Sequence, residues 1–244
     1  MAKLLVTGGC GSLGIALVKE ALNPVRGFES VIGLSNDEYQ VVEAKRLIPE
    51  AVWVLCDVRD LTALTDVFKK HEPTHVIHAA ALKHVPICEE FPNEAFKTNV
   101  LGSRNVLDLC LGIKALAVST DKAVKAVNVY GTTKFLMEGM FLKAGHKIFR
   151  SGNFMGSRGS VIEIWREQAK TGTITMTDPE ALRYFIEIDD AAKQCLDHLE
   201  NGEGVLIPEM LEWSLATLAN FYHPECGWDI TGLRPGEKMR EELR

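Results

Sequence analysis

Short apolar runs alternate with longer segments of helical spacing through the first two thirds of the chain. Each apolar run is bounded by glycine or polar residues, which is typical of buried strands. We expect strands at Lys3–Thr7, Ser30–Leu34, Val52–Cys56, His75–Ala79, Ala115–Ser119 and Lys147–Ser151. Apolar residues at helical spacing predict helices over Ser12–Leu22, Leu61–Lys70, Asn93–Leu111 and Asn128–Lys143.

This alternation of strand and helix predicts an α/β fold, a Rossmann doubly wound parallel sheet with helices on both faces. Ligands of such sheets bind outside the carboxyl ends of the strands. After residue 151 the predicted elements become shorter and turn signals such as Asp178-Pro179 crowd in. We therefore expect a dinucleotide-binding Rossmann domain at 1–151 and mainly a small substrate-binding cap at 152–244, with 184–200 returning to the Rossmann domain.

Composition and charge narrow the class of protein further. Hydrophobic residues are 46% of the chain and charged residues 25%, which is ordinary for a globular protein. The net charge of −6 argues against nucleic acid as a partner. We expect neither a membrane-spanning segment nor a signal peptide, and the six cysteines form no CxxC pair. We expect a reduced, cytoplasmic protein that binds no metal and no membrane.

A glycine-rich turn follows the first predicted strand. Gly9, Gly11 and Gly14 form a GxGxxG pattern, and Gly8 precedes it. Such a turn lets a pyrophosphate approach backbone N–H groups at the start of a helix. Because the pattern follows a strand and opens a helix with apolar periodicity, it predicts a dinucleotide site.

The ends of the next strands carry candidates for the rest of that cofactor. After the second strand, Asp37 is placed to bind a ribose 2′-hydroxyl and no arginine is adjacent, so the chemistry favours NAD slightly over NADP. Asp57 after the third strand can meet the adenine amino group or cap the following helix. Small side chains at Ala79, Ala80 and Ala81 leave room for a cofactor across the sheet edge.

The end of the fifth strand and the helix after it carry the candidate chemistry. Tyr130 and Lys134 are four residues apart on a predicted helix and share one face. A lysine and an oxidised nicotinamide beside the tyrosine would lower its pKa and make it a base, as in short-chain dehydrogenases. Asp121 and Lys122 add an acid and a base at the strand end, which indicates proton transfer beyond hydride transfer. We expect burial and nearby positive charge to lower the pKa of Lys122.

The sequence resembles the inverting UDP-N-acetylglucosamine 4,6-dehydratases, which are extended short-chain dehydrogenase/reductases of polysaccharide and pseudaminic acid synthesis. The similarity runs in order along nearly the whole chain. The matching stretches are TGGCGSLG at 7–14, SNDE at 35–38, DVRD at 57–60, HAAALKHVP at 78–86, KTNVLGSRNV at 97–106, STDKAV at 119–124, YGTTK at 130–134, SGNFMGSRGSVI at 151–162 and GLRPGEKMREEL at 232–243.

The resemblance implies a role for each matching residue. Tyr130, with Lys134, would take the proton of the sugar 4-hydroxyl while hydride moves to NAD or NADP. Lys122 would then remove the C5 proton and Asp121 would protonate the departing 6-hydroxyl, with Thr120 beside them. The cofactor would be held tightly and recycled in each turnover by Thr7, Gly8, Gly11, Ser12, Leu13, Gly14, Ser35, Asn36, Asp37, Asp57, Val58, Ala79, Ala80, Ala81, Asn99, Tyr130 and Lys134. A UDP-sugar would be bound by Lys83, Asn153, Arg158, Arg183, Arg234 and Glu237.

Two features depart from the family pattern. Asn36 stands where the family has an arginine that would face a 2′-phosphate, and the chain ends soon after the RPGEK stretch. We therefore expect a shortened form with a reduced cap, and, as in the family, a homo-oligomer. We interpret the acidic stretch Glu237–Glu242 as a solvated helix face.

Two other functions remain as alternatives. One is a sugar-nucleotide epimerase, or a dehydratase of different regiochemistry, on the same scaffold. The other is a non-catalytic dinucleotide-binding regulator. The Asp121-Lys122 pair favours the 4,6-dehydratase, because a 4-epimerase eliminates no water. The intact Tyr130 and Lys134 disfavour the regulator.

Overall fold

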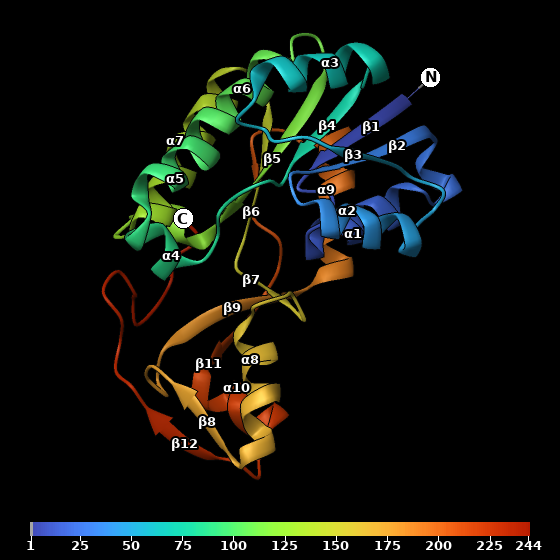
Figure 1. Ribbon diagram of the computed structural model, residues 1–244. Helices are drawn as coiled ribbons and strands as arrows, with labels where there is room; N and C mark the ends of the chain where they lie inside the picture. Colours follow the sequence, from blue (N-terminus) through green and yellow to red (C-terminus); the bar gives the residue numbers. More distant parts are fainter. Residues whose placement is uncertain (1) are drawn as a thin grey trace.

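A seven-stranded sheet forms the larger part of the molecule in the computed structural model, which describes residues 2–244 (Figure 1). Every strand pair in it is parallel, and the strand order is β10-β6-β5-β4-β1-β2-β3. This order reverses direction between β1 and β4, as in a Rossmann fold, and it confirms the predicted fold class. The strands are β1 (Ala2–Thr7), β2 (Phe28–Ser35), β3 (Val52–Leu55), β4 (His75–His78), β5 (Lys114–Thr120), β6 (Lys147–Ser151) and β10 (Val205–Leu206).

Helices cover both faces of the sheet, each over its own apolar cluster (Figure 1). One face packs against α1 (Ser12–Ala21), α2 (Glu38–Leu47) and α9 (Ile188–Asn201). The other packs against α3 (Leu61–His71), α6 (Ser103–Asp108) and α7 (Val129–Lys143). Helix α9 comes late in the chain but lies against α1, so residues beyond the sixth strand contribute to the Rossmann core.

Two helical stretches differ from the sequence-based expectation. Helix α2 was not predicted, because only Val41 and Ala44 of its ten residues are buried and its apolar periodicity is weak. The single helix expected over 93–111 is α5 (Pro92–Phe96), a π-helical turn (Lys97–Gly102) and α6. A π-helical turn inserts an extra residue and often marks a functional site. Helix α4 (Val85–Glu90) comes directly before α5.

A smaller lobe lies below the sheet in Figure 1 and has an apolar cluster of its own around Trp165 and Phe185. It contains a three-stranded sheet, a two-stranded sheet and two helices. Its elements are β7 (Asn153–Met155), α8 (Val161–Gln168), β8 (Thr173–Met176), β9 (Leu182–Glu187), β11 (Leu211–Ser214), α10 (Leu215–Tyr222) and β12 (Gly227–Ile230). Short 3₁₀ turns occupy Pro24–Arg26, Asp121–Ala123 and Ala169–Thr171. Among residues 2–244, no helix has the length and apolar character needed to cross a membrane.

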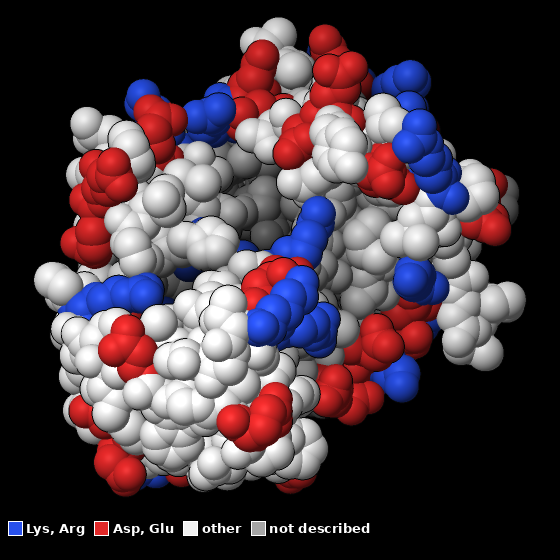
Figure 2. Space-filling view, turned by 60° about the horizontal axis from the view of Figure 1, so that its bottom comes forward, with Lys and Arg blue, Asp and Glu red and all other residues white. Residues whose placement is uncertain are grey.

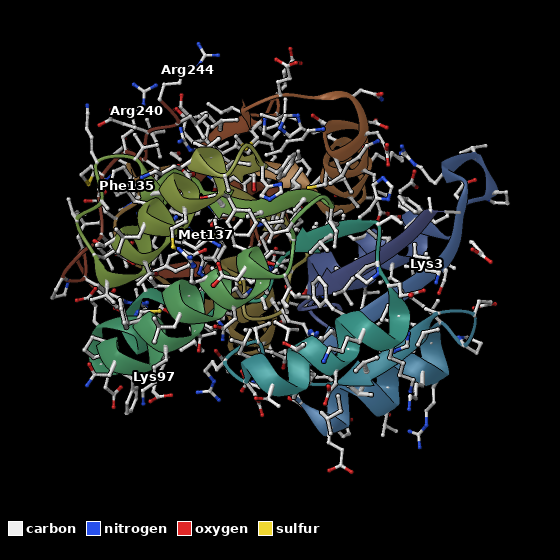
Figure 3. All side chains as sticks on the ribbon, turned by 90° about the horizontal axis from the view of Figure 1, so that it is seen from above. Lys3, Lys97, Phe135, Met137, Arg240 and Arg244 are labelled. Atoms are coloured by element: carbon white, nitrogen blue, oxygen red, sulfur yellow. The ribbon has the colours of Figure 1, made fainter. Side chains whose placement is uncertain are left out.

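Helix α7 offers a matched pair of aromatic residues that tests this packing. Phe141 is fully buried and stacks on His78 of β4 with ring centroids 5.8 Å apart. Phe135 is 58% exposed and lies at the outer edge of the molecule (Figure 3). Phe141→Ala is expected to lower the free energy of unfolding by about 3–5 kcal/mol, because it leaves a cavity, and Phe135→Ala by less than about 1 kcal/mol. Urea unfolding followed by circular dichroism measures both, and equal losses would contradict the packing described.

Candidate active site

The turn between β1 and α1 brings three glycines into close backbone contact. Gly8 has φ of +67°, and a Cβ there would lie 2.8 Å from the Ala80 nitrogen. A Cβ on Gly14 would lie 2.2 Å from the Gly8 carbonyl oxygen, so only glycine fits. Gly11 is the N-cap of α1, and no side chain of residues 2–244 caps this helix end. The first N–H groups of α1 therefore remain available to an anion at the carboxyl edge of the sheet.

Polar groups at the ends of β2 and β3 are held by their own neighbours. The Asp37 carboxylate caps α2, accepting hydrogen bonds from the Gln40 backbone N–H at 3.0 Å and its side-chain amide at 2.9 Å. The backbone N–H of Gln40 lowers the pKa of Asp37. Asp57 accepts hydrogen bonds from Arg59 and, at 3.2 Å, from Asn36 Nδ2. Ser35 Oγ accepts a hydrogen bond from the Asp37 N–H.

Arg158, in the loop after β7, lies against the glycine-rich turn. Its backbone N–H donates to Ser12 Oγ at 3.0 Å, and its guanidinium donates to the Cys10 carbonyl and to Gln40 Oε1 at 3.2 Å. Lys83 Nζ donates to the Arg158 carbonyl at 2.8 Å. The structure thus places this guanidinium against the turn where the cofactor is expected, although the resemblance implies a sugar-nucleotide ligand.

Asn99, in the π-helical turn, hydrogen-bonds both to the segment after β4 and to α7. Its Oδ1 accepts the Leu82 N–H at 2.8 Å, and its Nδ2 donates to Thr133 Oγ1 at 3.0 Å. It therefore fixes the strand end that contains Ala79, Ala80 and Ala81 relative to the helix that carries Tyr130. Thr7 was expected to contact the cofactor. In the structure its hydroxyl is hydrogen-bonded to the buried His78 Nδ1 at 2.7 Å. Val58, after β3, packs against Gly102 of the π-helical turn.

Asp121 and Lys122 meet at the carboxyl end of β5. Lys122 Nζ lies 3.0 Å from Asp121 Oδ1, which also accepts the Thr120 hydroxyl at 2.8 Å. Asp121 is fully buried. Burial lowers the pKa of Lys122, but the carboxylates of Asp121 and Glu241 outweigh it and the net pKa is raised. The expectation of a lowered pKa is wrong, because it counted burial and nearby positive charge and left out both carboxylates, of which Asp121 has the larger effect.

Tyr130 and Lys134 lie on α7, beside that pair. Burial raises the pKa of Tyr130 to about 12, against the lowering effect of the Lys122 charge. Lys134 Nζ contacts Met137 Sδ at 3.0 Å inside the helix layer (Figure 3 shows Met137). Burial lowers the pKa of Lys134 to about 8, and Glu138 opposes that shift. Within the described chain, the positive group that acts on the Tyr130 phenol is therefore Lys122.

Of the remaining expected substrate residues, Arg183 lies near the end of β5, and the others hydrogen-bond to β9 or within their own segment. Arg183 on β9 is buried, donates to the Leu182 carbonyl at 2.8 Å and places its charge near Lys122. Asn153 Nδ2 donates to the Tyr184 carbonyl at 3.2 Å. Arg234 and Glu237 follow β12, and the Glu237 carboxylate accepts the Arg234 N–H at 3.2 Å. Figure 2 shows a hollow between the two lobes with Lys and Arg side chains along part of its rim.

Glu241 is the functional candidate that sequence reasoning missed. Glu237–Glu242 is not a solvated helix face as expected: it forms no helix, and Glu241 is 3% exposed with Oε1 3.4 Å from Lys122 Nζ. The acidic run carried no local signal for this, because the contact joins residues far apart in the chain.

Lys134 provides a test of the buried charge in this site. The unfolded chain binds a proton at Lys134 up to its ordinary pKa of 10.5, and the folded chain only up to about 8. The charged lysine therefore destabilises the fold below pH 8, and the penalty fades as the pH rises from about 8 to 10.5. Lys134→Met is expected to raise the free energy of unfolding at pH 7 by up to about 3 kcal/mol, and by much less at pH 10.

Urea unfolding midpoints of this variant and of wild type, compared at both pH values, measure that difference. Lys143→Met, at an exposed position of the same helix, is the control and should change neither midpoint. A difference between Lys134→Met and wild type that stays constant with pH would contradict a buried charge at Lys134.

Comparisons with known proteins agree with this geometry. The UDP-N-acetylglucosamine 4,6-dehydratase (inverting) of Campylobacter jejuni is 36% identical over 98% of this chain and 76% of that protein. The UDP-glucose 4-epimerase of Rickettsia canadensis is 32% identical over the same shares. The X-ray structure of Pen from Bacillus thuringiensis superposes with a TM-score of 0.91 at 27% identity, over 98% of this chain and 79% of that one. The family model described as "Polysaccharide biosynthesis protein" matches residues 4–244, and the chain belongs to that family.

Proposed function

We propose that the protein is an NAD(P)-dependent sugar-nucleotide 4,6-dehydratase that acts on UDP-N-acetylglucosamine and inverts C5. The carrying observation is the buried Asp121 carboxylate 3.0 Å from Lys122 Nζ, on the strand end that also faces Tyr130. Elimination of water needs one group that accepts a carbon-bound proton and one that protonates a leaving hydroxyl. The name of the Campylobacter jejuni relative supports this reaction and this substrate.

The proton transfers that remove water are assigned to side chains of this chain. Tyr130 removes the proton of the 4-hydroxyl, and a bound NAD(P) would supply the hydride acceptor and donor. Before elimination, the proton of Lys122 passes to Asp121 through their direct contact, which leaves Lys122 neutral and Asp121 protonated. Lys122 then takes the C5 proton, which the new 4-ketone has acidified, and Asp121 protonates the departing 6-hydroxyl, so that water leaves. Hydride would return from the cofactor to C6, and a solvent proton would enter C5 from the face opposite to the one that lost its proton.

The residues around the first turn fit a dinucleotide. The uncapped start of α1 offers backbone N–H groups to the pyrophosphate, and no acidic side chain lies in its first turn. The Asp37 carboxylate already caps α2, and this hydrogen bonding disfavours Asp37 as a ligand of a ribose hydroxyl. Arg158 presents a guanidinium between the turn and α2. We assign it to a cofactor phosphate, in the place of the charge that Asn36 lacks.

The substrate side fits a nucleoside diphosphate sugar. Arg183 and Arg234 supply cations suited to a diphosphate, and Glu237 and Asn153 supply groups that read hydroxyls. Lys83 donates a hydrogen bond to the Arg158 carbonyl, so it lies next to the loop that contacts the glycine-rich turn. We propose that these residues bind the sugar nucleotide in the hollow of Figure 2.

An epimerase is the second candidate, because relatives named UDP-glucose 4-epimerase match over nearly the whole chain. It needs the glycine-rich turn and Tyr130, and both are present. It has no step for the Asp121–Lys122 pair. Incubation of the protein with UDP-N-acetylglucosamine separates the two, with the product analysed by mass spectrometry and proton NMR. Loss of one water supports the dehydratase, and an isomer of unchanged mass supports the epimerase.

Lys122→Met is expected to lower the rate of water loss by about 10³-fold or more, because the C5 proton loses its acceptor. Cofactor binding and oxidation at C4 should persist, so reduced cofactor should accumulate and be visible by its absorbance. Lys125→Met is the control, since Lys125 is exposed and pairs with Glu242 on the surface. Full dehydration by Lys122→Met would remove Lys122 from the mechanism.

Arg158→Gln is expected to weaken NADP binding by about 10- to 100-fold, the range of a charge-assisted hydrogen bond. NAD should lose much less if the guanidinium meets the 2′-phosphate, and as much if it meets the pyrophosphate. Calorimetric titration with each dinucleotide measures this. The control is Arg166→Gln, at an exposed position on α8. Unchanged affinity for both dinucleotides would leave Arg158 a purely structural contact.

A further inference from the structure

Glu241 is a buried carboxylate to which the proposed reaction gives no role. Its Oε1 lies 3.4 Å from Lys122 Nζ and its Oε2 3.8 Å from Lys238 Nζ. Oε2 is buried and has no hydrogen-bond partner within residues 2–244. A buried charge is costly unless it is paired, so a carboxylate held here without full hydrogen bonding indicates a use for the charge.

The segment that carries Glu241 is fixed at several points before it reaches Lys122. It leaves β12 in the smaller lobe and returns to the larger one (Figure 1), where Arg150 of β6 donates to the Leu243 carbonyl at 2.8 Å. Asn128 Nδ2 donates to the Gly236 carbonyl at 2.8 Å, and Lys238 Nζ donates to the Val124 carbonyl at 2.7 Å. The Leu182 N–H donates to the Met239 carbonyl at 2.7 Å.

The residues on either side of Glu241 point to the surface. Arg240 pairs with Glu212 and lies at the periphery in Figure 3. Glu242 pairs with Lys125. Glu241 alone is turned inward, between two outward-facing neighbours, which is the alternation of an extended segment. Its direction is therefore set by the backbone rather than by chance rotation of a surface side chain.

Lys122 consequently sits between two carboxylates. Asp121 Oδ1 is 3.0 Å from its Nζ on one side, and Glu241 Oε1 is 3.4 Å on the other. The titratable and charged groups that face Lys122 from the elements around it are Asp121, Tyr130 on α7, Arg183 on β9, and Lys238 and Glu241 on the returning segment. Of these, the two carboxylates stabilise its positive form and Arg183 opposes it.

We propose that Glu241 is a positioning residue that acts through Lys122: its carboxylate stabilises the Lys122 ammonium and so sets how much of Lys122 is in the neutral form that takes the C5 proton. The inference rests on the proposed dehydratase function. The step starts after the proton of Lys122 has passed to Asp121, so that Lys122 is neutral and Asp121 is protonated. The C5–H bond then breaks and its proton moves to Nζ, while the electron pair left at C5 expels the 6-hydroxyl. That hydroxyl takes a proton from Asp121 and leaves as water. Glu241 changes neither bond nor charge state, and it touches no reacting atom.

The test compares Glu241→Gln, which keeps the shape and removes the charge, with Glu242→Gln at the exposed neighbouring position. The first experiment needs no substrate. Acetic anhydride modifies only neutral amines, so the acetylation rate of Lys122 in the full chain, read by peptide mass spectrometry, follows its neutral fraction.

In wild type and Glu242→Gln we expect this rate to rise about tenfold for each pH unit up to pH 10. In Glu241→Gln we expect a higher rate at pH 8 and a plateau that begins at a lower pH than in wild type. A merely loosened segment would raise the rate equally at all pH values. Parallel profiles for Glu241→Gln and wild type would therefore overturn the proposal.

The second experiment uses UDP-N-acetylglucosamine. At pH 8, Glu241→Gln is expected to release the C5 proton several-fold faster, because more of Lys122 is neutral, with KM and cofactor reduction at C4 unchanged. Slower release of the C5 proton, or an equal change in both steps, would reduce Glu241 to a structural role and contradict the proposal. If wild type leaves this substrate untouched, the dehydratase proposal fails. The acetylation profiles still decide whether Glu241 controls Lys122.

Discussion

The contact between Lys122 and Asp121 is the interaction on which the site depends. Taking a carboxylate and an ammonium out of water is costly, and the pair repays it only with good geometry. β5 provides that geometry, because it lies between β4 and β6 and its last residue, Thr120, is paired with Ser151 of β6 directly before Asp121. The chain then turns through Asp121–Ala123 and enters α7, which brings Tyr130 to the same edge.

The sheet and the glycine-rich turn could be predicted from sequence because they follow from local patterns. Apolar runs flanked by turn residues marked the first six strands, and β1 to β6 all lie where they were expected to within a few residues. The glycine spacing predicted the tight turn at Gly8 and Gly14, whose conformation and contacts exclude other residues. Helix α2 was not predicted, because a helix with few buried residues shows little apolar periodicity.

The charges around the site could not be predicted in the same way, since they arise from contacts between distant segments. Arg158 reaches the turn at Cys10 from the loop after β7. Glu241 reaches Lys122 from the last residues of the chain and, together with Asp121, raises the pKa of Lys122. Likewise, the four-residue spacing of Tyr130 and Lys134 predicted a shared face correctly, but the lysine nitrogen contacts Met137. Periodicity reports which face a side chain occupies, and not which charge it meets there.

The most direct test of the central claim is the fate of the hydrogens at C4 and C5. UDP-N-acetylglucosamine deuterated at C4 is incubated with the protein in ordinary water, and unlabelled substrate in D₂O, and the products are read by NMR. The account predicts a product that has lost water, with the C4 deuterium at C6 in the first experiment and one solvent deuterium at an inverted C5 in the second. A product that keeps its oxygen at C6 and its deuterium at C4, with no exchange at C5, would contradict it.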